Sequence, residues 1–334
     1  MRAPLTSVDV TIRPLRPADV TAAVELLVLA AGAEKRHRLT SRLTTDTLDE
    51  IHHALVAERD GVLVGAAKLT TEPANPGTVS VLVAVAESAR GEGVGTALAA
   101  ELRDRATRTL TPGLVLTTAL RDDLDRGRQF AERHGMVLTN HSVGWRFDLT
   151  GRGEEVGALA ASAADRAGVR VRATDLASDE ATVLECVGRT LVGLPVPGGE
   201  AEDVDLAHAR SVIPERALVL LAEPSDPEGG PALGLTIVTA QVGTDDWYTV
   251  YTGVDVNHRG RGVATALKTA ALRYAYDAGA TAVTTHNDDT NEPILRANRA
   301  LGMTPTTGYW SLVQTVNATP ASSPAPAPSP APSI

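Results

Sequence analysis

Short segments rich in apolar residues alternate along this chain with segments whose apolar residues recur every three to four positions. The first pattern predicts β-strands and the second predicts α-helices, so their alternation indicates the α/β fold class. Asp60-Gly61 predicts a tight hairpin turn between two of the strands. The first half is expected to contain, in order, strand 8–15, helix 20–33, a short helix within 34–50, strands 54–59, 62–71 and 79–86, helix 96–105, strand 114–119, helix 124–134 and strands within 136–149.

The same pattern starts again near residue 169. Residues 150–168 are rich in Gly, Ala and Glu and lack strand character, which predicts a linker with helical spacing over 154–166. Residues 317–334 repeat Pro, Ala and Ser, which cannot bury enough apolar area to order themselves, so we expect a disordered tail. The second half is expected to contain strand 169–172, helix 178–192, a turn at 194–199, helix 201–210, strands 217–223, 232–240 and 247–256, helix 265–274, strand 282–286, helix 292–301 and strand 306–316.

One motif occurs twice, each time between a predicted strand and a predicted helix. Residues 90–95 read Arg-Gly-Glu-Gly-Val-Gly, and residues 259–264 read Arg-Gly-Arg-Gly-Val-Ala, so the two arginines are offset by 169 positions (259 − 90). Two later landmarks keep nearly the same spacing, namely Gly135-Met136 with Gly302-Met303 and Trp145 with Trp310. A repeat of this size indicates a duplicated domain. We therefore predict domains at 1–150 and 169–316, a linker at 151–168 and the tail at 317–334.

Each motif has the features of an anion site. The first N–H groups of a helix have no intrahelical partner and the helix dipole adds positive charge there, while glycines let the backbone approach a phosphate closely. A dinucleotide-binding turn would place its glycines directly at the strand end, whereas residues 255–258 form a polar spacer. A nucleotide-binding loop would follow its glycines with Lys-Ser/Thr, which is missing here.

The two motifs resemble the Gln/Arg-x-x-Gly-x-Gly/Ala signature of the GCN5-related N-acetyltransferases (the GNAT superfamily), which holds the pyrophosphate of acetyl-coenzyme A. The chain is similar to the tandem, mycothiol synthase-like members of that family over nearly its whole length. The resemblance implies two mixed, twisted sheets flanked by helices, each with a splayed pair of central strands, and acetyl-coenzyme A as co-substrate without a metal. The coenzyme-binding residues it implies are Val254, Val256, Arg259, Gly260, Arg261, Gly262, Val263 and Ala264, and in the first domain Val85, Arg90, Gly91, Gly93, Val94 and Gly95.

The resemblance also implies positions for catalysis. The residue seven before the arginine, Thr252, places its backbone N–H at the thioester carbonyl. Many relatives carry a carboxylate base eleven residues before the arginine, where this chain has Tyr248 in the second domain and Val79 in the first. An unperturbed phenol is a weak base at neutral pH. The carboxylates that stay open as bases acting through a water are Glu223, Asp245 and Asp246.

The general acid of many relatives is a tyrosine four residues before a Gly-Phe pair. Here the pair is Gly-Met and the matching residues are Asn298 and Ala131, so neither domain has that tyrosine. Tyr309 and Tyr251 remain open as substitutes. Water also remains open, because a thiolate is a tolerable leaving group.

The two domains differ after the strand that follows the motif helix. Asn287, Asn291 and Asn298 resemble the amides that bond the pantetheine and its pyrophosphate in many relatives, although turns and helix caps also favour asparagine. The equivalents in the first domain are Leu120, Leu124 and Ala131, which cannot form such bonds. We therefore predict catalysis in the second domain. The first domain is expected to be degenerate, either holding a coenzyme without turning it over or serving as a packing partner.

Composition narrows the function further. The formal net charge of −10 argues against nucleic-acid binding and favours encounter with a cationic small molecule. Cys186 is the one cysteine, which excludes an internal disulfide and a cysteine-based metal site. No secretion signal or bilayer-spanning stretch is visible, so we expect a cytoplasmic protein without a membrane partner.

We predict an acetyl-coenzyme A-dependent N-acetyltransferase that acts on a primary amine of a small, preferably cationic molecule. The alternative is a non-catalytic sensor or scaffold that binds acyl-coenzyme A on the same fold. Because the repeat makes the chain an internal pseudo-dimer, we expect either a monomer or a homodimer.

Overall fold

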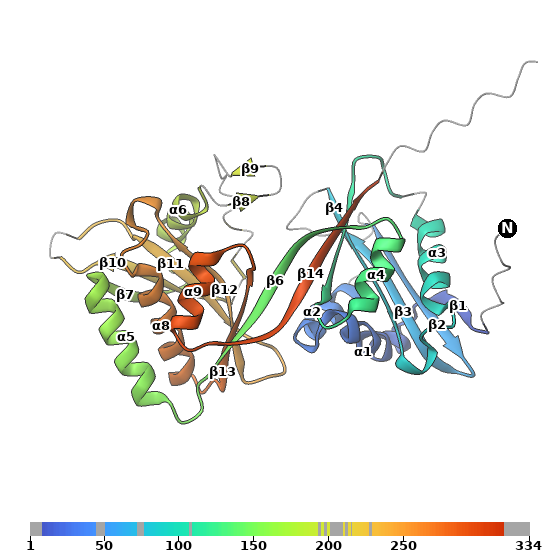
Figure 1. The fold of residues 1–334 in the computed structure, drawn as a ribbon, viewed down its shortest axis with the longest axis horizontal. Helices are drawn as coiled ribbons and strands as arrows, with labels where there is room; N and C mark the ends of the chain where they lie inside the picture. The colour runs from blue at the N-terminus through green and yellow to red at the C-terminus, as the bar shows by residue number, and fades with distance from the viewer. Residues whose placement is uncertain are drawn as a thin grey trace, which may run out of the picture.

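The computed structural model describes residues 9–44, 51–71, 77–106, 109–192, 195–196, 199–200, 210, 213–214, 216–226 and 229–316. These residues form two lobes in which helices cover a twisted sheet, and two long strands run from one lobe into the other (Figure 1). Of the predicted helix 201–210 only residue 210 is described, and the predicted tail at 317–334 lies outside the described residues.

The first half of the chain folds in the predicted order. Its helix α3 begins at Val94, directly after Gly93, whose φ of 89° lies in the left-handed region that glycine adopts without strain. The segment 136–149, where several strands were predicted, holds one uninterrupted strand. The elements are β1 (Thr11–Pro14), α1 (Val20–Ala31), α2 (Arg36–Thr44), β2 (His52–Arg59), β3 (Val62–Thr71), β4 (Thr78–Val85), α3 (Val94–Ala106), β5 (Val115–Arg121), α4 (Asp125–Arg133) and β6 (Val137–Asp148).

The second half repeats this order after the helix α5 (Gly153–Ala167). That helix occupies the predicted linker, and its buried Val156 and Ala163 pack in the same apolar clusters as residues of α8. It ends at Gly168, whose φ of 63° is typical of a helix C-terminus. The remaining elements are β7 (Val169–Thr174), α6 (Glu180–Leu191), β8 (Pro195–Val196), β9 (Gly199–Glu200), β10 (Leu218–Pro224), β11 (Gly234–Ala240), β12 (Asp246–Val254), α8 (Val263–Asp277), β13 (Ala282–Asp288), α9 (Glu292–Ala300) and β14 (Thr304–Thr315).

Twelve strands join into one sheet in the order β1-β2-β3-β4-β5-β14-β6-β13-β12-β11-β10-β7. Two neighbouring pairs are parallel, β4 with β5 and β12 with β13, and the other pairs are antiparallel. The sheet is therefore mixed, as predicted. The last strand of each sequence repeat lies between strands of the other repeat, since β14 pairs with β5 and β6 pairs with β13.

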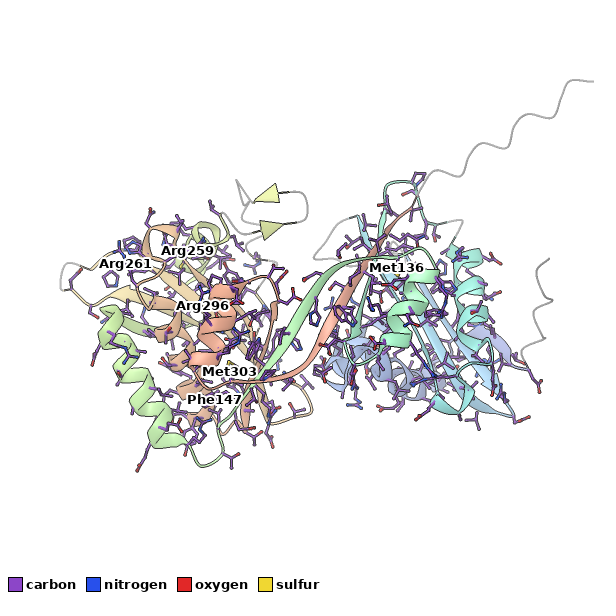
Figure 2. All side chains as sticks on the ribbon, viewed as in Figure 1. Met136, Phe147, Arg259, Arg261, Arg296 and Met303 are labelled. Atoms are coloured by element: carbon purple, nitrogen blue, oxygen red, sulfur yellow. The ribbon has the colours of Figure 1, made fainter. Side chains whose placement is uncertain are left out.

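Strands β6 and β14 exchange between the lobes. They run side by side through the waist of the molecule (Figure 1), and each pairs with the other over most of its length. Trp145 and Phe147 at the end of β6 are buried in the core of the C-terminal lobe, beside Met303. Figure 2 shows Phe147 and Met303 in one lobe and Met136, directly before β6, in the other. In return, Leu312 of β14 is buried in the core of the N-terminal lobe. Neither lobe is completed without a strand from the other repeat.

Two glycines lie where β6 and β14 approach each other most closely, beside the register shift between Thr306 and Tyr309. A Cβ atom at Gly144 would lie 2.2 Å from the carbonyl oxygen of Thr307, and a Cβ atom at Gly308 would lie 2.0 Å from the carbonyl oxygen of Ser142. Real side chains do not approach a backbone atom so closely, so only glycine fits at either position.

A histidine of β6 connects the two lobes at this waist. The Nε2 atom of His141 lies 3.0 Å from the Asp122 carboxylate of the N-terminal lobe, and its Nδ1 atom lies 2.9 Å from the Asp289 carboxylate after β13. Its ring also packs on Trp310 of β14 at 4.0 Å between centroids. Burial lowers the pKa of His141, but the hydrogen bonds to the two carboxylates outweigh burial and the net shift is upward. Both carboxylates are best satisfied when the imidazole carries its second proton.

Replacing His141 by Gln is expected to destabilise the fold more in mild acid than in mild base. A group whose pKa is raised on folding contributes its full stability below its unfolded pKa, and loses that contribution as the pH rises through its folded pKa. We expect the loss of unfolding free energy at pH 5.5 to exceed the loss at pH 9 by about 1 kcal/mol, the size of a charge-assisted hydrogen bond at a partly exposed site. Urea unfolding of wild type and His141→Gln at the two pH values measures this difference. An equal loss of unfolding free energy at both values would contradict a charged His141 between Asp122 and Asp289.

Candidate active site

The two glycine motifs adopt the same conformation in both lobes. The Nε atom of Arg90 donates to the Val85 carbonyl at 3.0 Å, and the Nε atom of Arg259 donates to the Val254 carbonyl at 3.0 Å. Each arginine thus fastens its loop to the strand before it. The second and fourth residues of both motifs have left-handed φ angles between 75° and 89°, which favour glycine; they are Gly91, Gly93, Gly260 and Gly262.

Each loop leads directly into the N-terminus of a long helix. The first helical hydrogen bonds are donated by the N–H groups of Ala97 in α3 and Ala266 in α8, so the preceding N–H groups have no intrahelical partner. Gly262 stands at the N-cap of α8 and offers no side chain to cap it. In Figure 2, Arg259 and Arg261 lie on the same side of the C-terminal lobe. Free N–H groups, the helix dipole and two guanidinium groups together favour a polyanion such as a diphosphate.

The strand before each loop separates from its parallel neighbour. β4 pairs with β5 only from Thr78 to Ser80, and β12 pairs with β13 only from Asp246 to Tyr248. Beyond the fork the strands diverge, and in the C-terminal lobe the hydroxyl of Thr285 reaches across to the Thr249 carbonyl at 3.1 Å. A fork of this kind leaves backbone N–H and C=O groups without a strand partner. It suits an extended ligand that carries amides of its own.

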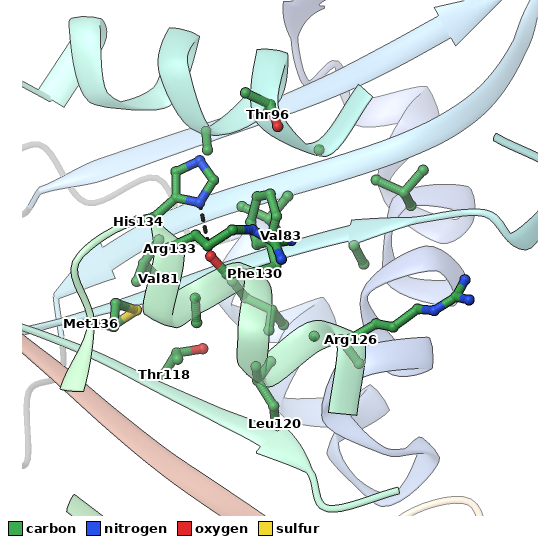
Figure 3. Close-up of a pocket in the computed structure, with 18 of the residues that line it drawn as sticks. Val81, Val83, Thr96, Thr118, Leu120, Arg126, Phe130, Arg133, His134 and Met136 are labelled. Atoms are coloured by element: carbon green, nitrogen blue, oxygen red, sulfur yellow. Dashed lines mark hydrogen bonds between the residues drawn. The ribbon is translucent and has the colours of Figure 1, made fainter. Parts of the chain in front are cut away.

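In the N-terminal lobe the fork opens into a cleft of about 910 Å³ between α3 and α4. Apolar side chains form its floor, including Leu120, Leu124 and Ala131, which occupy the positions of the missing amides. Figure 3 shows Phe130 and His134 of the α4 segment over the cleft, and the Nδ1 atom of His134 lies 2.9 Å from the Phe130 carbonyl. Arginines stand along the lining, namely Arg90, Arg103, Arg126 and Arg133. The lining also holds Asp123 and Asp125, so arginines outnumber carboxylates four to two around a mostly apolar cleft.

Of the three predicted asparagines of the C-terminal lobe, Asn287 and Asn298 bond each other and Asn291 caps a helix. The Nδ2 atom of Asn298 donates to the Oδ1 atom of Asn287 at 2.8 Å, and the fully buried Oδ1 atom of Asn298 has no partner among the described residues. A buried acceptor without a partner is costly in folding free energy. Asn291 instead accepts from the Ile294 N–H at the start of α9, which is the helix-cap role.

The fork of the C-terminal lobe carries a tyrosine and a histidine. The hydroxyl of Tyr248 lies 3.3 Å from the Nδ1 atom of His286 on β13, and the ring of Tyr309 packs against His286 with 4.9 Å between the ring centroids. The structure therefore joins two predicted residues, Tyr248 and Tyr309, through a histidine that the sequence analysis did not select. Its position at the carboxyl end of a strand parallel to the motif strand was the available signal.

The fork positions of the N-terminal lobe hold different residues. Its last paired residue is Ser80, and counting along β5 places Ala119 where β13 has His286. The predicted counterpart Val79 is one residue away from the fork, because β12 has a bulge at Val250 for which the pairing of β4 with β3 shows no equivalent. The N-terminal lobe thus lacks both members of the tyrosine–histidine pair.

Tyr309 is anchored by the N-terminal half of the chain. It is only 7% exposed, and its hydroxyl lies 3.0 Å from the Ala31 carbonyl and in hydrogen-bond contact with the Glu34 carboxylate. The ammonium of Lys35 sits 3.4 Å from the centre of the Tyr309 ring, and burial lowers the pKa of that lysine to about 8. Residues of both repeats therefore meet at the fork of the C-terminal lobe.

The other predicted catalytic residues lie apart from this pair. Glu223 on β10 is two strands away from β12 and bonds Arg170 and Arg172 at 2.9 and 2.8 Å. Burial raises the pKa of Glu223, but the two guanidinium groups outweigh it and leave a net lowering, which makes the carboxylate a weaker base. Thr252 lies beyond the fork, with its hydroxyl 2.8 Å from that of Thr236.

Of three further candidate site residues, two already bond other side chains and the third is exposed to solvent. The hydroxyl of Tyr251 donates to Thr190 of α6 at 3.1 Å, on the helix-covered side of β12. Asp246 forms an ion pair with Arg146 of β6 at 2.5 Å. Val256 lies in the short 3-10 turn Val256–His258 before the loop and is exposed.

Among the described residues, no three His, Cys, Asp or Glu side chains form a group that could hold a metal ion. Within the same ranges, no helix has both the length and the apolar character needed to cross a membrane.

Comparisons with known proteins agree with this geometry. The chain is 29% identical over 325 residues to the mycothiol acetyltransferase of Sanguibacter keddieii, covering 90% of this chain and 95% of that protein. It is 26% identical to the mycothiol acetyltransferase of Kocuria rhizophila, over 74% of this chain and 80% of that protein. Both relatives are matched over most of their length.

Solved structures share the fold. A GCN5-related N-acetyltransferase from Sphaerobacter thermophilus superposes with a TM-score of 0.68 at 19% identity, over 93% of this chain and 96% of that one. A tandem GNAT protein from the clavulanic acid biosynthesis pathway gives 0.65 at 20% identity, over 93% and 100%. The sequence model of the acetyltransferase (GNAT) family matches this chain twice, at residues 21–136 and 218–303. The chain therefore belongs to the acetyltransferase (GNAT) family and is a tandem N-acetyltransferase.

Proposed function

We propose that the C-terminal lobe transfers an acetyl group from acetyl-coenzyme A to a primary amine of a small molecule, by direct attack in a ternary complex. One observation carries this proposal. The single strand β12 places the glycine loop at its open end and Tyr248 at the fork, so that a donor stretched between them ends beside a polar pair. The N-terminal lobe repeats the loop and the fork without that pair.

The residues that would hold the donor follow from the site. The loop from Arg259 to Ala264 and the free N–H groups of α8 suit the diphosphate, and the bonded amide pair Asn287–Asn298 is proposed to serve the pantetheine amides. Bound acetyl-coenzyme A supplies an acyl group activated as a thioester. The backbone N–H of Thr252, beyond the fork, is proposed to stabilise the negative charge that develops on the carbonyl oxygen.

The N-terminal lobe is proposed to hold a second coenzyme molecule without turning it over. Its cleft of about 910 Å³ and its intact loop support binding. Ser80 and Ala119 at its fork offer no group that takes up a proton at neutral pH. The exchange of β6 and β14 gives this lobe a second role, because it supplies Glu34 and Lys35 to the C-terminal fork.

The acceptor is proposed to be a small, preferably cationic amine. The net charge of −10 favours a cationic partner on encounter. Both curated relatives are mycothiol acetyltransferases, so amines related to mycothiol come first in a screen, followed by aminosugars and polyamines. We further propose a cytoplasmic protein that acts as a monomer or homodimer.

A thiol-release assay across this panel tests the proposal. We expect at least one amine class to release coenzyme A well above the hydrolysis background, with one acetylated amine formed per thiol by mass spectrometry. Calorimetry with acetyl-coenzyme A alone separates the alternatives. Binding without turnover of any amine would favour a sensor or scaffold, and the absence of binding would refute both functions.

A further inference from the structure

The tautomer of His286 is fixed by its surroundings. Its Nε2 atom lies 3.3 Å from the backbone carbonyl of Thr307, and a carbonyl only accepts hydrogen bonds, so Nε2 carries the proton. The lone pair of Nδ1 then points to the hydroxyl of Tyr248, 3.3 Å away. The phenol therefore donates and the imidazole accepts. Both contacts are long, as hydrogen bonds of catalytic groups often are before substrate binds.

The charges around this pair keep it ready to accept a proton. Burial lowers the pKa of His286, the Lys35 ammonium lowers it further, and the Thr307 carbonyl with the Glu34 and Asp122 carboxylates acts in the opposite direction, for a net lowering. The imidazole is therefore neutral at pH 7. Burial raises the pKa of Tyr248, so the phenol keeps its proton until the imidazole takes it. Tyr309 also packs against the imidazole, and its hydroxyl contacts the Ala31 carbonyl and the Glu34 carboxylate.

We propose that His286 is the proton acceptor of the transfer reaction and that Tyr248 relays the proton to it; this rests on the acetyl transfer proposed above. The amine nitrogen forms a bond to the thioester carbon, and the C–S bond breaks with its electron pair leaving on sulfur as thiolate. The proton lost by the amine passes to the Tyr248 oxygen while the Tyr248 proton passes to Nδ1 of His286. The resulting imidazolium and the thiolate then exchange protons with water, which restores the neutral pair and yields the free thiol.

Pairing with His286 supplies the basicity that the Tyr248 phenol lacks by itself at neutral pH. A phenol titrates near pH 10 and is a poor base at neutral pH, whereas a neutral imidazole accepts a proton readily. The pair belongs to the fork itself, since Tyr248 is the last residue of β12 that pairs with β13. The N-terminal fork has neither member, which separates this role from a general packing role of the fold.

The test compares wild type with His286→Gln, Tyr248→Phe and the double variant, using the best amine of the panel. General-base catalysis contributes on the order of 100-fold or more, and we expect each single variant to lose that much of kcat/KM. The double variant should lose no more than either single one, because the two residues act as one unit. Affinity for acetyl-coenzyme A, measured by calorimetry, should stay within about threefold in all chains.

The pH profile distinguishes a proton acceptor from a structural residue. In wild type, kcat/KM should rise with pH through the lowered pKa of His286, and this acidic limb should disappear in His286→Gln. Added imidazole should restore part of the activity of His286→Ala. His53→Gln, on β2 and bonded to Thr109, is the matched control and should keep the wild-type profile.

Two results would overturn the proposal in distinguishable ways. An active wild type together with a His286→Gln chain that retains its rate within about threefold, or its acidic limb, would refute the relay alone. A wild type that is inactive with every amine would refute the acetyl transfer and the relay with it.

Discussion

Replacing Gly262 by Glu is expected to abolish acetyl transfer, with kcat/KM falling more than about 100-fold, which corresponds to about 2.8 kcal/mol. Gly262 has a φ of 85° and stands at the N-cap of α8, so a side chain there is strained. The added carboxylate would also occupy the end of the helix where a diphosphate is attracted, and would repel it. Calorimetry with acetyl-coenzyme A and the thiol-release assay measure the two effects.

The matched control lies in the other lobe. Gly93 has a φ of 89° before α3 and occupies the same place in its loop, so Gly93→Glu carries the same strain and the same charge. We expect this variant to lose the second coenzyme site in calorimetry while turnover falls only modestly. Comparable losses of turnover from both variants would contradict the division of labour between the lobes. Circular dichroism shows whether both chains fold.

Replacing Gly308 by Ala is expected to lower the free energy of unfolding by about 3 kcal/mol or more. The new Cβ atom would lie 2.0 Å from the Ser142 carbonyl oxygen, on a backbone that cannot move away without breaking the pairing of β14 with β6. Overpacking of this kind typically costs about 1–3 kcal/mol, and here both lobes depend on the displaced strand. Urea unfolding followed by circular dichroism measures the change.

Two companion variants sharpen this result. Gly144→Ala should destabilise by a similar amount, because its Cβ atom would meet the Thr307 carbonyl oxygen at 2.2 Å. Gly188→Ala in α6 has no atom within 4 Å of the added Cβ and should stabilise by about 1 kcal/mol, the ordinary gain of alanine over glycine in a helix. A loss below about 1 kcal/mol at Gly308 would contradict the close approach of β14 to the Ser142 carbonyl.

The exchange of β6 and β14 ties the two lobes into one folding unit. Strand β6 buries Trp145 in the core of the C-terminal lobe, and strand β14 buries Leu312 in the core of the N-terminal lobe. Unfolding of one lobe therefore withdraws a central strand from the other, and we infer that the lobes unfold together. The same exchange carries β14, and with it Tyr309, into contact with Glu34 and Lys35.

The sequence by itself determined the local parts of this protein. Apolar periodicity located most helices and strands within a few residues, because periods of 2 and 3.6 are properties of single segments. The duplicated motif at Arg90 and Arg259 indicated the family, and the structure shows both loops in one conformation. The sequence also showed that Asn298 of the second domain is matched by Ala131 in the first, because this comparison needs only the residue types at equivalent positions of the repeat.

Only the tertiary structure decided which segments meet. A strand's own residues do not specify its partner, so β6 gave no sign that it leaves its lobe, and the separate strands predicted at 136–149 are one strand. Glu223 was one of the candidate bases, and only the fold shows that Arg170 and Arg172 lie beside it and lower its pKa. The proposed role of His286 rests on its contacts with Tyr248 and Thr307, which are distant from it in the sequence. Long-range pairing and the electrostatic surroundings of a side chain are properties of the assembled fold, and no local pattern carries them.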